Sequence, residues 1–272
     1  MTPGVPDAPA ARALRAVRAV RAVILDTDGV ITDTARVHAA AWKAAFDAFL
    51  RAHPPEDPAQ RRPFAEEDYL RYVDGRSRLD GAASFLASRG LRLPPAAVEE
   101  VAAVKERAFT EALGGNGVDA YPGTVRLLHA LRDAGVPLAA ASASRHAREV
   151  LAHARVLGLF DVVVDGTEAA RLGLPGKPDP ALFLEAARRL GVPAGRCAVV
   201  EDALAGVAAG RRGGFGLVIG VDRTAGPGTG DALRHAGADL VVHDPGELLT
   251  GDEGAENTGA EGERTEGEGA HP

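Results

Sequence analysis

Short apolar runs that alternate with helix-like patterns constrain the fold of this chain more than any other feature. The runs AVIL, VPLAAAS, DVVVDG, RCAVVED, FGLVIGV and ADLVVHD occupy residues 22–25, 136–142, 161–166, 196–202, 215–221 and 238–244. Their length and apolar character are typical of buried parallel strands. From residue 120 onward they alternate with helical patterns at 125–135, 146–158, 180–191 and 204–214. The alternation predicts an α/β fold with a doubly wound, Rossmann-like parallel sheet.

A long stretch after the first apolar run has a different character. Helical patterns occur there at 36–52, 66–73, 78–90 and 95–113, and no strand-like run interrupts them. We therefore expect an all-helical domain inserted directly after the first strand. The predicted core comprises residues 22–35 and 119–250, and the predicted helical domain comprises residues 36–118.

Both ends of the chain read as extensions of the folded part. Residues 1–21 are rich in alanine and arginine, and we expect them to be flexible. Residues 251–272 contain seven acidic residues, one arginine and no large apolar side chain. Such a composition buries too little apolar surface to offset the entropy of ordering, so an acidic disordered tail is predicted.

Composition and charge exclude several classes of protein. The single cysteine, Cys197, cannot form an internal disulfide, lies in an apolar run and is expected in the core of a cytoplasmic protein. No apolar run approaches the roughly 18 residues of a membrane span. The net charge is -7, with no basic stretch of the kind that binds nucleic acid. We expect a monomer with a small-molecule substrate, and neither a nucleic-acid nor a membrane partner.

Polar residues follow three of the apolar runs. Asp26 and Asp28 come after the first run, Ser142 ends the second, and Glu201 and Asp202 end the run at 196–202. Ligands of doubly wound sheets bind outside the carboxyl ends of the strands. The pattern therefore predicts that these side chains line one crevice. The lysine of the segment GKPDP, at the start of a predicted helix, is expected to join them.

The chemistry of this set points to phosphoryl transfer. Crowded carboxylates repel one another unless a hard cation lies between them, and Mg²⁺ prefers oxygen ligands. Asp26, Glu201 and Asp202 suit that need, while Lys177 and Ser142 can bind phosphoryl oxygens. One carboxylate is then available to attack phosphorus and form an aspartyl-phosphate, with Asp28 as general acid and base.

A non-enzymatic phosphoacceptor module is the competing interpretation. Bacterial receiver domains also combine acidic residues, a hydroxyl, a lysine and Mg²⁺ on a doubly wound sheet. The inserted helical domain argues against it. Receivers also pair their acids consecutively, whereas Thr27 separates Asp26 from Asp28.

Four segments resemble the motifs of a known enzyme family. DTDGVITDT, SAS, GKPDP and VVEDALAG are similar, in order and spacing, to the four motifs of the haloacid dehalogenase superfamily of phosphotransferases. The run DGVITDT, followed by His38 and Trp42, most resembles the β-phosphoglucomutase subfamily. The resemblance implies Asp26 as nucleophile, Asp28 as acid/base, and Thr34 and His38 in supporting roles.

The same resemblance implies ligands for a metal and for the substrate. Mg²⁺ is expected on Asp26, Glu201, Asp202 and the backbone carbonyl of Asp28, and the transferring phosphate on Ser142, Ala143 and Lys177. In the helical domain, GRSRLDG resembles the segment whose arginine holds a second phosphate, which points to Arg78, with Lys105 in support. The chain departs from these mutases after SAS, where it has Arg145 and His146 instead of Lys-Asn. Arg145 is expected to contact substrate there.

These implications define the expected function. We expect Mg²⁺-dependent phosphoryl transfer on a sugar phosphate, from β-glucose 1-phosphate to glucose 6-phosphate, through an aspartyl-phosphate. A sugar-phosphate phosphatase is the alternative, because the two activities differ only in what discharges that intermediate.

Overall fold

The computed structural model of this 272-residue chain describes residues 20–115, 118–224 and 228–252. Most of the predicted extension at 1–21 and of the predicted tail at 251–272 lies outside the described residues. Within the described ranges, no helix combines the length and apolar character that a membrane span requires.

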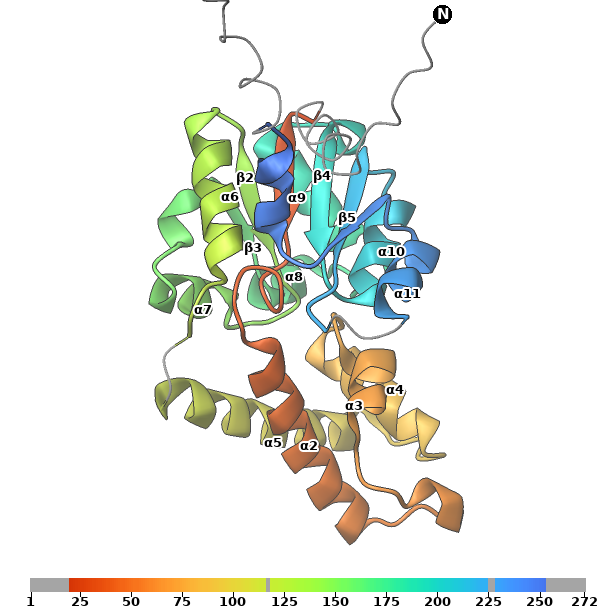
Figure 1. Cartoon of the computed structure of the whole chain (residues 1–272). Coiled ribbons are helices and arrows are strands. Elements are labelled where there is room, and N and C mark those ends of the chain that lie inside the picture. Colours follow the sequence, from red (N-terminus) through yellow and green to blue (C-terminus); the bar gives the residue numbers. More distant parts are fainter. Residues whose placement is uncertain (1–19, 116–117, 225–227, 253–272) are drawn as a thin grey trace, which may run out of the picture.

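A six-stranded parallel sheet forms the centre of the molecule (Figure 1). Its strands are β1 (Ala22–Leu25), β2 (Leu138–Ala141), β3 (Val162–Val164), β4 (Cys197–Glu201), β5 (Leu217–Val221) and β6 (Leu240–Val242). Their order is β3-β2-β1-β4-β5-β6, with every neighbouring pair parallel. The predicted doubly wound sheet is confirmed. Because the chain winds in opposite directions from β1 and from β4, the switch point lies between these two strands.

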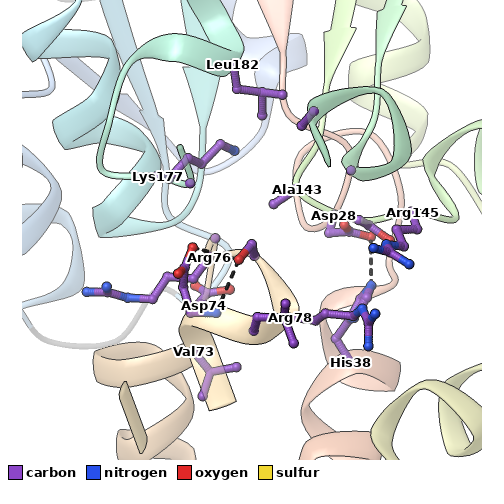
Figure 2. A pocket seen from close by; sticks show the side chains of 18 of the residues that line it. Asp28, His38, Val73, Asp74, Arg76, Arg78, Ala143, Arg145, Lys177 and Leu182 are labelled. Atoms are coloured by element: carbon purple, nitrogen blue, oxygen red, sulfur yellow. Dashed lines mark hydrogen bonds and ion pairs between the residues drawn. The ribbon is translucent and has the colours of Figure 1, made fainter. Parts of the chain in front are cut away.

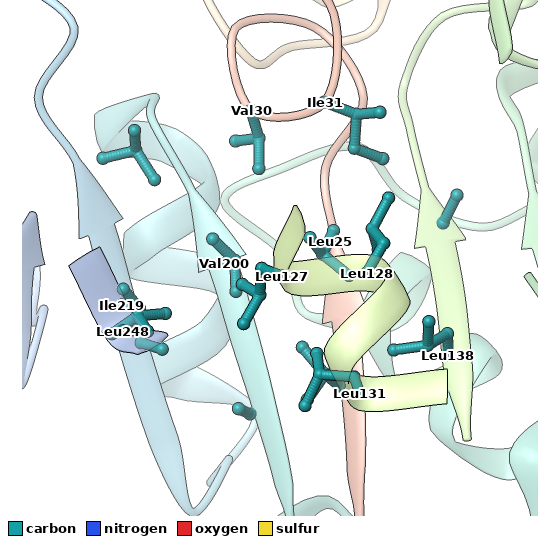
Figure 3. Packing of buried hydrophobic residues seen from close by; sticks show 14 of the residues in the cluster. Leu25, Val30, Ile31, Leu127, Leu128, Leu131, Leu138, Val200, Ile219 and Leu248 are labelled. Atoms are coloured by element: carbon teal, nitrogen blue, oxygen red, sulfur yellow. The ribbon is translucent and has the colours of Figure 1, made fainter. Parts of the chain in front are cut away.

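Helices cover both faces of the sheet. They are α6 (Pro122–Asp133), α7 (Ala147–His153), α8 (Gly166–Leu172), α9 (Ala181–Leu190), α10 (Leu204–Arg212) and α11 (Thr229–Ala236), with 3-10 turns η3 (Leu157–Leu159), η4 (Ala194–Arg196) and η5 (Pro245–Asp252). Side chains of β1 alternate between two hydrophobic clusters, Val23 and Leu25 on one face and Ala22 and Ile24 on the other. Figure 3 shows the first cluster, in which α6 and η5 pack on the sheet. The second cluster contains side chains from α9, α10 and α11.

Two predicted elements differ from the structure. The helix expected at 146–158 ends at His153, and Arg155 then adopts a left-handed conformation with φ 58°. The strand expected at 161–166 ends at Val164, because the Asp165 carboxylate accepts hydrogen bonds from two backbone N–H groups and caps α8, which was not predicted. Sequence reasoning treated Asp165 as the end of an apolar run, although it is an N-cap.

The segment between β1 and α6 forms the helical cap at the carboxyl ends of the strands (Figure 1). Its elements are α2 (Ala35–Ala52), the 3-10 turn η1 (Pro58–Gln60), α3 (Glu66–Asp68), the π-helical turn η2 (Tyr69–Val73), α4 (Arg78–Ser88) and α5 (Pro95–Gly115). The helix predicted at 66–73 is thus a short α-helix that continues as a π turn. The cap has a hydrophobic cluster of its own, in which Trp42 stacks on Phe46 with ring centroids 4.8 Å apart. The inserted all-helical cap is confirmed.

Arg223 holds the loop after β1 in place. Its guanidinium donates to the backbone oxygens of Gly29 (2.9 Å) and Val30 (3.0 Å) and pairs with Asp244 (3.0 Å). The same group stacks over the ring of Tyr121, 3.6 Å from its centroid. These contacts fix the backbone that carries Asp26 and Asp28 against the core.

Candidate active site

The loop after β1 places two carboxylates at the switch point of the sheet. Asp26 follows the last strand residue, and the backbone N–H of Asp28 donates to Asp26 Oδ2 at 3.0 Å. Gly29 has φ 81°, and a Cβ at that position would lie 1.8 Å from Asp202 Oδ2. Glycine therefore serves both the left-handed turn and the close approach of Asp202.

A buried lysine joins Asp26 to the end of β4. Lys177 Nζ lies 2.5 Å from Asp26 Oδ1 and 2.9 Å from Glu201 Oε2, and all three side chains are buried. Burial alone would lower the pKa of Lys177, but the two carboxylates outweigh it and raise that pKa. The lysine therefore stays charged and can neutralise an anion bound beside Asp26.

Three carboxylates beside this lysine suit a hard divalent cation. Asp26, Glu201 and Asp202 each offer an oxygen, and these oxygens lie within 4.8 Å of one another. Burial raises the pKa of Glu201 to about 8, and burial together with Asp74 and Glu201 raises the pKa of Asp202. Ionising all three carboxyl groups at once is costly unless a cation lies among them. Oxygen donors are the ligands that Mg²⁺ prefers. The residues present fit this ion.

Asp28 has different partners and does not belong to this carboxylate cluster. The Thr34 hydroxyl donates to Asp28 Oδ1, Ser142 Oγ lies 3.4 Å from Oδ2, and His38 Nε2 lies 3.3 Å from Oδ1. Burial would raise the pKa of Asp28, but His38, Thr34 and the Lys105 ammonium hold it below its usual range. A carboxylate outside the cluster is available to exchange a proton. The expected contact between Mg²⁺ and the backbone carbonyl of Asp28 stays a prediction.

His38 and Lys105 form the wall of the cap next to Asp28. Lys105 Nζ lies 2.9 Å from His38 Nδ1, and the His38 ring stacks on Phe109 at 3.9 Å between centroids. An ammonium only donates, so Nδ1 accepts and the neutral ring carries its proton on Nε2, toward Asp28. Burial lowers the pKa of His38, in agreement with a neutral ring, and lowers that of Lys105 to about 8.

A cavity of about 660 Å³ lies between cap and core and brings the remaining predicted residues together (Figure 2). Asp26, Asp28, His38, Arg78, Lys105, Ala143, Arg145, Lys177 and Asp202 line it. Arg78 opens α4, and its Nε is buried without a hydrogen-bond partner among the described residues. A buried donor without a partner is costly, so Arg78 is suited to an anionic ligand. Three other predicted residues are buried and are not part of this lining: Ser142, Thr34 and Glu201.

Sequence reasoning missed three acidic residues that line the cavity, Asp74, Asp80 and Glu106. Asp74 follows the π turn η2, and burial raises its pKa to about 6. Glu106 follows Lys105 on α5, and its Oε1 lies 2.9 Å from Nε2 of His146. Asp74 directly precedes the segment GRSR, which contains the predicted substrate arginine, Arg78. This position in the sequence could have indicated that Asp74 lies at the site. Glu106 had no such signal, because its contact joins two distant parts of the chain.

Acidic residues at the switch point, a buried lysine and a cavity between a helical cap and the core are the arrangement of a phosphoryl-transferring enzyme. The sequence profile of the haloacid dehalogenase-like hydrolases matches residues 20–214. The chain belongs to this family. It is therefore an enzyme, and the interpretation as a non-enzymatic phosphoacceptor was wrong.

Individual relatives show which subfamily of this family the chain resembles. The chain is 41% identical over 235 residues to a β-phosphoglucomutase of Mycobacterium bovis, covering 83% of this chain and 90% of the relative. It is 34% identical over 229 residues to a β-phosphoglucomutase of Bacillus subtilis, with the same coverage. The crystal structure of β-phosphoglucomutase from Clostridium difficile has a TM-score of 0.66 at 25% identity, covering 84% of this chain and 93% of that one. The chain thus resembles the β-phosphoglucomutase subfamily, as its motifs predicted.

Proposed function

We propose that this enzyme interconverts β-glucose 1-phosphate and glucose 6-phosphate, using Mg²⁺ and an aspartyl-phosphate on Asp26. Arg78 gives this proposal its main support: its Nε is buried and has no hydrogen-bond partner in the part of the chain that the structure describes, and Arg78 lines the same cavity as Asp26 and Lys177. A cavity with cationic groups for two phosphates suits a sugar bisphosphate. The 41% identity to a β-phosphoglucomutase supports the choice of sugar. We further propose a monomer in the cytoplasm, in keeping with a buried free cysteine.

The residues of this chain divide the reaction into two transfers. A carboxylate oxygen of Asp26 attacks phosphorus, the bond from phosphorus to the donor oxygen breaks, and Asp28 gives that oxygen a proton. In the second transfer a sugar hydroxyl attacks the aspartyl-phosphate, Asp28 takes its proton, and Asp26 is released. Lys177 balances charge on the transferring group, and Arg78 holds the other phosphate. Bound Mg²⁺ would neutralise the three carboxylates and the phosphoryl oxygens.

The alternative is a sugar-phosphate phosphatase, which the description of the matching family as hydrolases favours. In that case water, not a sugar hydroxyl, attacks the aspartyl-phosphate. One incubation separates the two activities: β-glucose 1-phosphate, Mg²⁺ and a trace of glucose 1,6-bisphosphate, with glucose 6-phosphate and inorganic phosphate assayed together. Glucose 6-phosphate in excess supports the mutase, whereas inorganic phosphate alone would replace the proposal with the phosphatase.

Arg78→Ala is expected to distinguish substrates with one phosphate from those with two. The charged contact to the second phosphate would be lost, so kcat/KM for the sugar phosphate should fall about 10-fold or more. Hydrolysis of an aryl phosphate, which has no second phosphate, should stay within about 2-fold of wild type. Steady-state kinetics on both substrates make the comparison. Equal losses would remove the evidence for a second-phosphate site.

The pKa of Lys105 predicts how activity changes with pH. Burial lowers it to about 8, so the free enzyme loses the ammonium above that pH rather than near 10.5. We expect kcat/KM for β-glucose 1-phosphate to decline above about pH 8, since this parameter reports groups of the free enzyme. Lys105→Met is uncharged at every pH. In this variant the declining limb of the pH profile should be absent, and kcat/KM on the plateau below pH 8 should be lower than in wild type. A profile of the variant that keeps the same limb would assign it to another group.

A further inference from the structure

His146 links the core directly to the cap. It lies between β2 and α7, and its Nε2 is 2.9 Å from Glu106 Oε1 on α5 of the cap. Its Nδ1 lies 3.1 Å from Glu149 Oε2, which belongs to α7 of the core. The imidazole therefore lies between two carboxylates, and of these two contacts the one with Glu106 reaches from the core to the cap.

The part of α5 that this contact holds is the part that faces Asp28. Phe109, one turn beyond Glu106, lies 5.3 Å from the His146 ring and stacks on His38. Lys105, the neighbour of Glu106, contacts His38 on the same side. A loss of the bond between His146 and Glu106 would release α5 at the place where it closes the cavity beside the acid/base.

The cap also meets the core at other places. His38 Nε2 lies 3.3 Å from Asp28 Oδ1, and Phe109 of α5 shares a hydrophobic cluster with Val150 of α7. A Cβ on Gly75 would lie 2.7 Å from the Ala203 Cβ, and one on Gly176 would lie 2.4 Å from Asp80 Oδ2. Gly75 lies in the loop between η2 and α4 and Asp80 lies in α4, whereas Glu106 lies in α5. Several contacts therefore join the cap to the core, and the one between His146 and Glu106 is a hydrogen bond with a charged acceptor.

We propose that His146 and Glu106 are positioning residues that keep the cap closed over the aspartyl-phosphate and thereby limit its hydrolysis. This inference rests on the proposed function. With the cap closed, a sugar hydroxyl attacks phosphorus, the bond to the Asp26 oxygen breaks, and Asp28 takes the proton. With the cap open, a water oxygen makes the same attack and inorganic phosphate leaves. The contact thus sets the ratio of transfer to hydrolysis.

Two single variants and their combination test the contact. Glu106→Ala removes the carboxylate, and His146→Phe keeps a ring against Phe109 but removes both nitrogens. Each should raise the ratio of inorganic phosphate to glucose 6-phosphate about 3- to 10-fold. The double variant should exceed neither single variant, because both remove one contact. Glu149→Ala, which removes the carboxylate within the core, is the matched control and should keep the wild-type ratio.

A second measurement needs no substrate and so separates this inference from the proposed function. Trp42, the only tryptophan in the sequence, lines the cavity and is 3% exposed. Acrylamide should quench its fluorescence more strongly in Glu106→Ala and His146→Phe than in wild type or Glu149→Ala. Additive effects in the double variant, unchanged quenching in both single variants, or an equal effect of Glu149→Ala would overturn the inference. A wild-type enzyme that forms no glucose 6-phosphate would instead refute the proposed function. The quenching measurement would still decide whether His146 and Glu106 hold the cap.

Discussion

The Asp26→Asn variant is expected to lose phosphoryl transfer completely, a decrease in kcat of at least about 10⁴-fold. An amide cannot attack phosphorus, and it removes one carboxylate from the cluster with Glu201 and Asp202. The variant should still fold, since burial already disfavours the charge at this position. Steady-state assays with both β-glucose 1-phosphate and an aryl phosphate measure the loss, and thermal unfolding checks the fold. Turnover near that of wild type would rule out Asp26 as nucleophile.

The Asp28→Asn variant is expected to slow turnover by about 10² to 10⁴ while retaining Mg²⁺ affinity. The Asp28 carboxylate contacts Thr34, His38 and Ser142 and lies outside the carboxylate cluster, so its loss should remove proton transfer and spare the cation. Hydrolysis of an aryl phosphate with a very acidic leaving group should be slowed less in its first step, because such a group departs without a proton.

Calorimetric titration with Mg²⁺ supplies the control for the Asp28 variant. Asp202→Asn serves as the matched comparison, since it changes a carboxylate of the cluster and should weaken Mg²⁺ binding. If Asp28→Asn weakened Mg²⁺ binding as much as Asp202→Asn while turnover of the loaded enzyme was unchanged, Asp28 would be a metal ligand rather than an acid/base.

Three residues of the candidate site could be predicted because each of them is tied to a strand. Asp26 follows β1, Ser142 follows β2, and Glu201 ends β4. A parallel sheet therefore brings these residues to one edge, independently of the conformation of the loops. The structure places Lys177 with them, between Asp26 and Glu201. A periodic pattern and a rule about strand ends were sufficient for these positions.

Residues whose placement depends on tertiary contacts could not be predicted in the same way. Glu106 and His146 are 40 positions apart and meet only because the cap folds over the core. Asp165 was misread because one carboxylate can end an apolar run or cap a helix, and the choice depends on the backbone that follows. No sequence pattern around His38 predicts a role for it, and only the family resemblance implied one. The structure places His38 beside Asp28.

The central claim is that phosphoryl transfer passes through Asp26. Its most direct test is an acid-quenched, millisecond incubation of the enzyme with Mg²⁺ and glucose 1,6-bisphosphate labelled with ³²P, followed by peptide mapping. The account predicts an alkali-labile label on the peptide that contains Asp26, formed as fast as turnover and absent from Asp26→Asn. Label on another residue, or glucose 6-phosphate formed by an enzyme that never carries label, would contradict it.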